Sequence, residues 1–348
     1  MEAQALPALR PLRLGELLDQ AIRIYRRNFV TFIGIIALVY VPLMVLQTAA
    51  TTVLGTSLDD ISRSNSTEEI LSNYAYWGGM LSTITVAFLQ FIFVQGIATG
   101  ALTRAVADNY LGKTTSILDA YRGIGKSWVS LLGALLLIGI LGIAVFLWWV
   151  IVPCVGWFTG LGMLAYLSAA VSPMVAPVVV LEGRGAFDSV QRAWYLVRRR
   201  FWPVLGTIFV LYLFNLLIVN GPSAIVNFLL TTILPSFGNA TTQYIVTAVI
   251  QAMVAIVFIL IYYPLQMTAF TLIYFDLRVR TEGFDLALLA SGDAQQVLTT
   301  PVPQTNEKFM TGTDLGNFAI LTLGAVGLYI FLFAFLFGGL FFLSSLFN

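Results

Sequence analysis

The sequence predicts an all-α integral membrane protein with about seven transmembrane helices. Of the 348 residues, 59% are hydrophobic and only 10% are charged, whereas an average soluble domain has roughly 25% charged residues. The apolar residues are clustered into seven stretches without Lys, Arg, Asp or Glu, and each can cross a hydrocarbon layer of about 30 Å, which needs about 20 helical residues. The predicted spans are 29–54, 76–103, 128–152, 155–180, 203–234, 241–273 and 318–345.

The first predicted span follows a charged helix and has no small-residue cleavage pattern. We therefore expect it to remain in the protein and not to be removed as a signal peptide. Runs such as 131–152 are apolar on every side. That pattern is typical of helices embedded in lipid and not of barrel strands, whose two faces differ in polarity.

Basic residues are concentrated on one side of the predicted membrane. Arg63 is the only one of the 18 Lys and Arg residues that falls in a loop on the opposite side, which leaves 17 on the first side. Because short loops rich in Lys and Arg stay in the cytoplasm, this distribution predicts a cytoplasmic N-terminus.

An internal repeat is suggested by the first six spans, which pair as three hairpins. An amphipathic helix precedes each hairpin and places apolar residues on one face and charged residues on the other. Each of these helices carries an Asp followed one turn later by an Arg, a spacing that favours ion pairing along a helix. The predicted pairs are Asp19 with Arg23, Asp119 with Arg122, and Asp188 with Arg192.

Four regions follow from this pattern. They are a cytoplasmic amphipathic N-terminal helix (1–28), a six-helix membrane domain of three hairpins with cytoplasmic interfacial helices (29–290), a polar cytoplasmic linker (291–317) and an appended C-terminal transmembrane helix (318–348). The linker contains Pro301 and Pro303 and is predicted to lack regular structure from Ser291 to Thr313.

Several chemistries are excluded by composition. The chain has no His, and Cys154 is its only Cys. Haem ligated by His, His-based zinc sites, Ser-His or Cys-His nucleophile pairs and an internal disulfide are therefore impossible within this chain. We expect no metal, no cofactor and no nucleic-acid partner. No ionisable residue lies inside a predicted span, which argues against an ion-coupled transporter.

Three segments carry a family resemblance. LRLGELLD (12–19) continues to YRRNF (25–29); VLEG (180–183) is followed by AWYLV (193–197) and FW (201–202); and YFDLRVRTEGFDL covers 274–286. Together they resemble bacterial six-span membrane proteins related to the membrane domain of glycerophosphoryl diester phosphodiesterase and to the YciC-like proteins. The resemblance implies an architecture and a bacterial inner membrane but no activity, since the phosphodiesterase chemistry of fused relatives belongs to a separate soluble domain. The seventh span departs from the six-span pattern.

Basic residues at the cytoplasmic interface are candidate contacts for anionic lipid or for a partner, because each such charge near anionic lipid contributes about 1 kcal/mol. The alternative is that they only determine topology and extend toward the headgroups. The candidates are Arg23, Arg26, Arg27, Arg122, Lys126, Arg192, Arg198, Arg199 and Arg200.

Uncharged polar residues inside the spans are a second candidate set. They could line a cavity for a polar headgroup or a quinone, or they could form hydrogen bonds between helices. The set comprises Gln90, Gln95, Asn215, Asn220 and Gln266, with Gln47, Asn227 and Gln251 as further members. Asn220-Gly221-Pro222-Ser223 is predicted to break the fifth span, either as the broken helix of a transporter or before a short outer helix over 223–234.

The leading hypothesis is a non-enzymatic scaffold or accessory subunit that contacts anionic membrane lipids and, through the aromatic-rich seventh span, another membrane protein. The alternative is a carrier or flippase for a lipid or other apolar molecule. An enzyme ranks third because Asp and Glu are predicted to lie only in loops. Its best carboxylates would be Glu182, Asp276 and Glu282.

Overall fold

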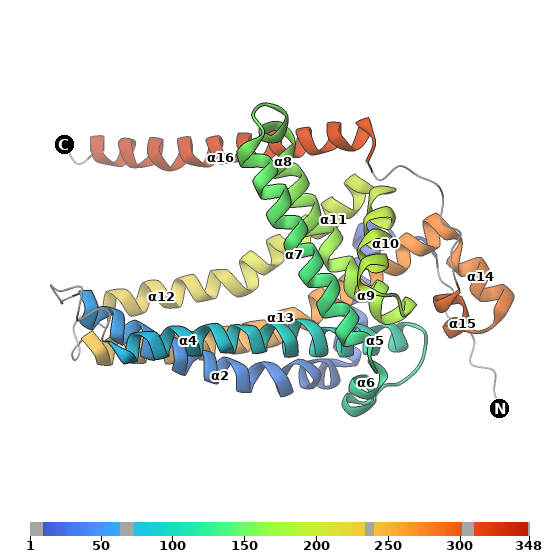
Figure 1. Ribbon diagram of the computed structural model, residues 1–348, viewed down its shortest axis with the longest axis horizontal. Coiled ribbons are helices and arrows are strands. Elements are labelled where there is room, and N and C mark those ends of the chain that lie inside the picture. Colours follow the sequence, from blue (N-terminus) through green and yellow to red (C-terminus); the bar gives the residue numbers. More distant parts are fainter. Residues whose placement is uncertain (1–9, 63–72, 234–239, 301–309, 347–348) are drawn as a thin grey trace.

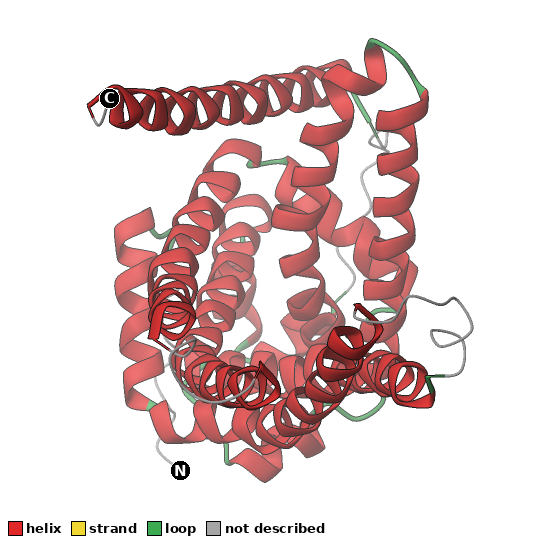
Figure 2. Ribbon diagram, turned by 90° about the vertical axis from the view of Figure 1, so that its left-hand side faces the viewer, coloured by secondary structure: helices red, strands yellow, loops and turns green. Residues whose placement is uncertain are grey.

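The protein is helical throughout the part of the chain that its computed structural model describes, which is residues 10–62, 73–233, 240–300 and 310–346. Those residues contain no strand (Figure 2), and seven of their helices are long and apolar enough to span a membrane. The predicted fold class, an all-α membrane protein with seven spans, is confirmed.

Each span consists of one helix or of consecutive helices joined without a turn. The first three are α2 (Phe29–Ser62), α4 (Tyr74–Gln90) with η1 (Phe91–Ala98) and α5 (Thr99–Tyr110), and α7 (Ser127–Ile151). The next two are α8 (Val155–Ala165) with η2 (Tyr166–Val171) and α9 (Ser172–Glu182), and α11 (Phe201–Asn215) with η3 (Leu216–Asn220) and α12 (Gly221–Ile233). The last two are α13 (Ala240–Glu282) and α16 (Gly312–Leu346).

Shorter helices precede or connect the spans. They are α1 (Leu14–Arg27), α6 (Ile117–Gly123), α10 (Ala186–Arg198), α14 (Phe284–Ser291) and α15 (Ala294–Thr299). On α1, the face containing Leu17, Ala21 and Tyr25 is buried, and the Tyr25 hydroxyl donates a hydrogen bond of 2.9 Å to the Ile261 carbonyl of α13. The amphipathic pattern of α1 thus docks it on the sixth span.

The spans cross at different angles (Figure 1). Helices α2, α4 and α13 run side by side, α7 is steeply inclined to them, and α16 lies along one edge of the molecule, where it packs on α8. The span formed by α8, η2 and α9 is the most buried of the seven. Small residues make this possible, because Gly156, Thr159, Gly160 and Gly162 are all buried on α8 and let neighbouring helices approach closely.

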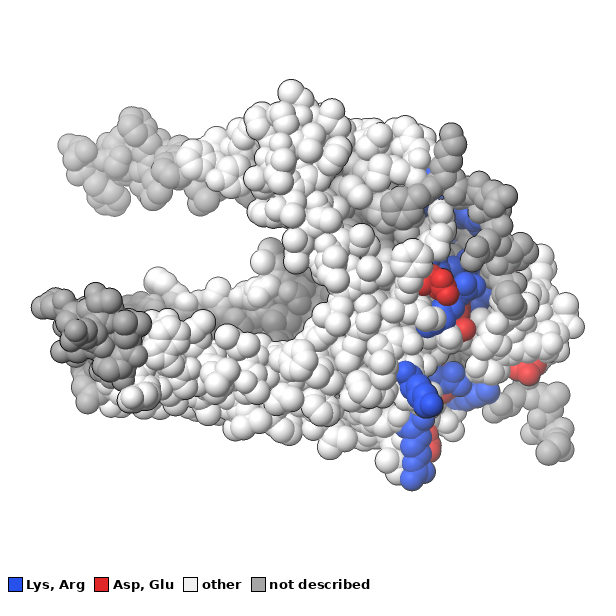
Figure 3. All heavy atoms as spheres, in the orientation of Figure 1, with Lys and Arg blue, Asp and Glu red and all other residues white. Residues whose placement is uncertain are grey.

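Charged side chains gather at one end of the molecule, which we call the basic end. On the face in Figure 3, Lys and Arg lie on the right and most of the remaining described surface is uncharged. Helices α1, α6, α10, α14 and α15 lie at this end. The last residues of α2 and α12 and the first residues of α4 and α13 lie at the opposite end, which we call the far end.

The predicted break in the fifth span is wrong. The chain stays helical from α11 through η3 to α12, so no separate outer helix begins at Ser223. Pro222 lacks an N–H group to donate to the preceding turn. The wider π turn of η3, which immediately precedes Gly221 and Pro222, absorbs this defect within a continuous helix.

The predicted absence of structure over 291–313 is also wrong in part. Helix α15 begins after Asp293, whose side chain accepts hydrogen bonds from the backbone N–H groups of Gln295 and Gln296, and α16 already begins at Gly312. Short polar segments can form helices when an N-terminal capping residue satisfies the first N–H groups. Pro301 and Pro303 lie outside the described residues.

The repeat remains a prediction, and its expected ion pairs are wrong. The three amphipathic helices differ in length, with 14 residues in α1, seven in α6 and 13 in α10. Asp119 accepts a hydrogen bond from Ser116 instead of pairing with Arg122, and Arg192 pairs with Glu182 and Glu282 instead of Asp188. Asp19 and Arg23 form no ion pair in the described structure.

Candidate functional site

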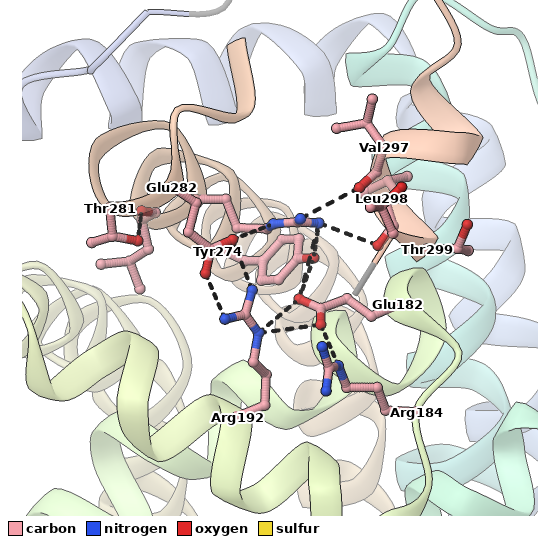
Figure 4. A network of polar contacts seen from close by, with 12 residues as sticks. Glu182, Arg184, Arg192, Tyr274, Thr281, Glu282, Val297, Leu298 and Thr299 are labelled. Atoms are coloured by element: carbon pink, nitrogen blue, oxygen red, sulfur yellow. Dashed lines mark hydrogen bonds and ion pairs between the residues drawn. The ribbon is translucent and has the colours of Figure 1, made fainter. Parts of the chain in front are cut away.

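A network of ion pairs is buried at the basic end, between α9, α10 and α13 (Figure 4). The guanidinium of Arg192 donates from Nε to both carboxylate oxygens of Glu182, each at 3.2 Å, and from Nη2 to Glu282 at 2.8 Å. Arg184 donates to the same Glu182 carboxylate at 2.6 Å. One arginine on α10 therefore joins the end of α9 to the end of α13.

Arg278 forms the second half of the network. Its Nε donates to Glu282 at 3.0 Å, and its Nη groups lie 3.4 Å from the carbonyl oxygens of Val297 and Leu298 on α15. Its guanidinium lies 4.8 Å from the ring centroid of Phe284. Because the Arg278 side chain is only 3% exposed, these contacts fix α14 and α15 against the membrane domain.

Two Glu-Gly pairs position the carboxylates. Glu182 ends α9 and Glu282 ends α13. The glycines that follow, Gly183 and Gly283, have φ of +66° and +64°. A left-handed residue after the last helical turn suits glycine, which has no Cβ to clash. The repeated pair therefore ends both helices at the same depth, so that Arg192 reaches both carboxylates.

The electrostatics of the network favour its charged form. Burial lowers the pKa of the Arg192 guanidinium, but its hydrogen bond to Glu282 and the charges of Glu182 and Glu282 outweigh burial and raise it. Glu182 also accepts a hydrogen bond from the Tyr274 hydroxyl at 3.0 Å. Several donors already bind these carboxylates, which thereby tie the ends of α9, α10 and α13 together.

A cavity of about 520 Å³ opens beside this network, between α1, α11 and α13; we call it the basic-end pocket. Its lining includes Arg13, Arg200, Val204, Gly206, Asp276 and Arg280.

Asp276 and Arg280 of α13 line the basic-end pocket and pair with each other. Nε of Arg280 donates to both oxygens of Asp276, at 2.8 and 2.9 Å, and Asp276 also accepts from the backbone N–H of Leu12 at 2.8 Å. Arg200 makes no ion pair with any described residue. The pocket thus holds three arginines against one carboxylate, and that carboxylate is already neutralised.

A second cavity, of about 580 Å³, lies toward the far end between α2, α12 and α13, and we call it the far-end groove. No Lys, Arg, Asp or Glu lines it. Its polar side chains include Gln47, Thr51, Ser223, Asn227, Tyr244 and Gln251.

The nine basic residues predicted to contact lipid or a partner lie in different environments. Arg192 belongs to the buried network, and Arg198 pairs with Asp314 of α16 at 3.0 Å, so these two are structural. Arg200 lines the basic-end pocket. Arg23 and Arg27 line a smaller cavity of about 210 Å³ together with Lys113. The exposed remainder is Arg26, Arg122, Lys126 and Arg199.

The five intramembrane polar residues predicted first, Gln90, Gln95, Asn215, Asn220 and Gln266, do not form one site. The Asn220 amide donates to Asn215 at 3.0 Å, which is a pairing within one span, and none of the five lines the far-end groove. Gln47, Asn227 and Gln251 from the wider set do. The spacing of Tyr244, Thr247 and Gln251 on α13 is a signal that could have identified this polar face.

The expectation that Asp and Glu lie only in loops is wrong. Glu182, Asp276 and Glu282 are all helical, and α13 continues nine residues beyond the predicted end of the sixth span at 273, to Glu282. Arginine pairing stabilises these carboxylates at the end of a long apolar helix. Among the described residues, no group of three or more His, Cys, Asp or Glu is arranged to hold a metal ion.

Comparisons with known proteins place the chain in a family. No curated protein and no solved structure matches it. Residues 12–277, which are more than half of the chain, match one protein family. The match begins before α1 and ends at Leu277 of α13, so it takes in the first five spans, most of the sixth, the far-end groove, all lining residues of the basic-end pocket except Arg280, and Glu182 and Arg192 of the buried network. The chain therefore belongs to the family described as Domain of unknown function (DUF7847).

Proposed function

We propose that the protein is a non-enzymatic membrane scaffold or accessory subunit that binds an anionic lipid in the basic-end pocket. The observation that carries the proposal is the placement of Arg13, Arg200 and Arg280 around a cavity whose other walls are mostly apolar. We place the protein in a bacterial cytoplasmic membrane with the basic end inside, on the family resemblance of the sequence and the positive-inside rule.

The charge of the pocket suits a phosphate-bearing headgroup. Asp276 is engaged by Arg280 and by the Leu12 N–H group, so the charges of Arg13 and Arg200 are left to face an anion. A basic residue near anionic lipid contributes about 1 kcal/mol, and arginine binds phosphate through two parallel N–H groups.

The walls of the pocket suit an acyl chain. Val204 and Gly206 lie in the first turns of α11, next to Ile273 and Leu277 of α13. An acyl chain that follows α11 away from Arg200 would run along the start of the fifth span. The volume of about 520 Å³ is within the range of roughly 300 to 1,000 Å³ that is typical of small-molecule sites.

The carrier or flippase hypothesis is favoured by one observation. The far-end groove and the basic-end pocket both lie where the fifth span runs beside α13. Between them, however, the Tyr262 hydroxyl is buried and donates to the Leu211 carbonyl. Transport would require this contact to open, whereas a scaffold needs no such opening.

Gly206 offers a direct test of the pocket. A side chain at this position meets nothing within 4 Å, so Gly206→Phe should fill the cavity without distorting α11. Gly139 on α7 is equally unobstructed and lies outside the pocket, which makes Gly139→Phe a matched control.

The measurement is native mass spectrometry of the protein released from its own membrane. We expect wild type and Gly139→Phe to retain an anionic phospholipid, and Gly206→Phe and Arg200→Gln to lose it. Equal retention in all four proteins would contradict the proposal. Movement of labelled lipid between leaflets of reconstituted vesicles would instead favour the carrier.

A further inference from the structure

The far-end groove contains hydrogen-bonding groups that the described part of the chain does not satisfy. The side-chain oxygen of Gln47 is buried and accepts no hydrogen bond. Nε2 of Gln251 donates to Asn227 at 2.6 Å, and the Gln251 carbonyl oxygen and the Asn227 amide hydrogens form no hydrogen bond with another described residue. Buried polar groups are nearly always hydrogen-bonded in folded proteins, so the buried Gln47 oxygen calls for a partner.

The groove lies close to the depth of the lipid headgroups at the far end. Gln47 is 18 residues beyond Phe29, where α2 begins at the basic end. At 1.5 Å per residue this is about 27 Å along the helix, close to the roughly 30 Å thickness of a hydrocarbon layer. The polar lining therefore lies at the edge of the hydrocarbon layer, next to the headgroups of the leaflet at the far end.

The surroundings of the groove are apolar. Next to Asn227, Phe228 is 69% exposed, and next to Gln251 and the lining residue Ala252, Met253 is 55% exposed. Side chains of this kind on the outside of a membrane helix face lipid. A molecule that reaches the groove from the bilayer could thus keep its chains in lipid while its headgroup enters the groove.

The chemistry of the lining selects the headgroup. A charged headgroup would find no counter-ion, because the groove is lined by amides, hydroxyls and apolar side chains alone. A sugar or polyol hydroxyl both donates and accepts hydrogen bonds. It can therefore satisfy the oxygens of Gln47 and Gln251 and the amide hydrogens of Asn227 at the same time.

We infer that the far-end groove binds the uncharged, hydroxyl-rich headgroup of a lipid in the far leaflet. This site differs from the basic-end pocket in location, in charge and in ligand class. Tyr244 contributes to it in two ways: its ring lines the groove, and its hydroxyl donates to the Thr51 carbonyl at 3.2 Å, which ties α13 to α2.

Three substitutions test the site. Asn227→Leu and Gln251→Leu remove the amide pair from the groove. Gln47→Leu removes an oxygen that accepts no hydrogen bond in the described structure. The substitution should therefore leave folding intact. Asn220→Leu is the matched control, because it breaks a comparable amide pair with Asn215 on the same span outside the groove.

The experiment uses the full chain in nanodiscs of zwitterionic phospholipid that contain a small fraction of a monoglycosyl diacylglycerol. Binding is measured by native mass spectrometry, with the free monosaccharide in a parallel sample. We expect wild type and Asn220→Leu each to bind one glycolipid. Each groove variant should bind it about tenfold more weakly, which corresponds to one or two lost hydrogen bonds. The free sugar should not bind.

The outcomes separate this inference from the proposed function. Gly206→Phe should lose anionic lipid and keep the glycolipid, so either site can fail alone. Equal glycolipid binding in wild type and the three groove variants would overturn the inference. So would no glycolipid binding to folded wild type, or binding of the free sugar alone.

Discussion

Arg192 and Glu282 lie 90 positions apart in the sequence, yet the Arg192 guanidinium is 2.8 Å from the Glu282 carboxylate. The Glu282 side chain is only 6% exposed. This contact, with the one from Arg192 to Glu182, makes α10 a tie between the ends of α9 and α13. The same contact accounts for the length of α13, because the charged residues beyond the apolar run are stabilised in the helix by the pairing of Glu282 with Arg192.

Arg192→Ala is predicted to destabilise the protein strongly. The substitution removes the charged hydrogen bonds from Arg192 to Glu182 and Glu282, each of a kind that contributes about 1.5 to 3 kcal/mol. We expect a loss of about 3 kcal/mol or more, although Arg184 and Arg278 still pair with the two carboxylates. The free energy of unfolding can be measured by titrating the protein in mixed micelles with a denaturing detergent. Arg122→Ala, at an exposed position of α6, is the control and should change stability by less than about 0.5 kcal/mol. A similar loss in both variants would show that the network does not stabilise the fold.

Gly162→Ala is predicted to loosen α16. A Cβ at Gly162 would lie 1.9 Å from the backbone oxygen of Phe318 on α16, and the Gly162 N–H group donates to Thr322 at 2.8 Å. A protease site inserted between residues 300 and 310 would allow α16 to be cleaved from the rest and its co-purification measured.

Gly324→Ala is the control for this prediction. A Cβ at Gly324 meets nothing within 4 Å, and alanine is favoured over glycine inside a helix by roughly 0.5 to 1 kcal/mol. We therefore expect the α16 fragment to stay bound in wild type and Gly324→Ala and to dissociate in Gly162→Ala. If it stays bound in all three, the close approach at Gly162 is not what holds α16.

The spans could be predicted from the sequence because hydropathy needs no knowledge of tertiary partners. Each stretch of about 20 apolar residues must lie in lipid or in a core, and the described residues form seven such helices. The extent of the helices could not be predicted in the same way. Charged residues at the end of α13 look like a loop until their partners on α9 and α10 are known.

The candidate sites were only partly predictable for the same reason. The i,i+4 rule pairs Arg192 with Asp188, but it considers local neighbours alone. Glu182 and Glu282 are better partners because they are buried, where water competes less for the charge. The repeated Glu-Gly pair was visible in the sequence, but only the fold shows that both pairs end helices beside Arg192.

Alkaline pH is predicted to weaken the docking of α6. The Tyr121 hydroxyl donates to the Ile35 carbonyl of α2 at 2.5 Å, and burial raises the pKa of Tyr121 from 10.0 to about 12. The folded state therefore holds this proton more tightly than the unfolded state. Its contribution to stability is complete below about pH 10 and is lost as pH rises through about 12.

Tyr121→Phe isolates this effect. The variant lacks the hydroxyl and should be less stable at neutral pH by about 0.5 to 1.5 kcal/mol, the usual value of one hydrogen bond. Its stability should then fall less than that of wild type between pH 10 and 12, the window set by the raised pKa. Parallel curves for the two proteins would show that Tyr121 does not titrate with unfolding.

Cys154 allows the predicted orientation to be tested in intact cells. It is the only cysteine of the chain, it is exposed, and it lies in the turn between α7 and α8, across the third span from Lys126. If the basic end is cytoplasmic, a membrane-impermeant maleimide added outside should label Cys154 once the outer envelope is permeabilised. In Cys154→Ser with Lys126→Cys, the introduced thiol should react only after the inner membrane is disrupted. Labelling in the reverse order would place the N-terminus outside, and with it the basic-end pocket in the outer leaflet.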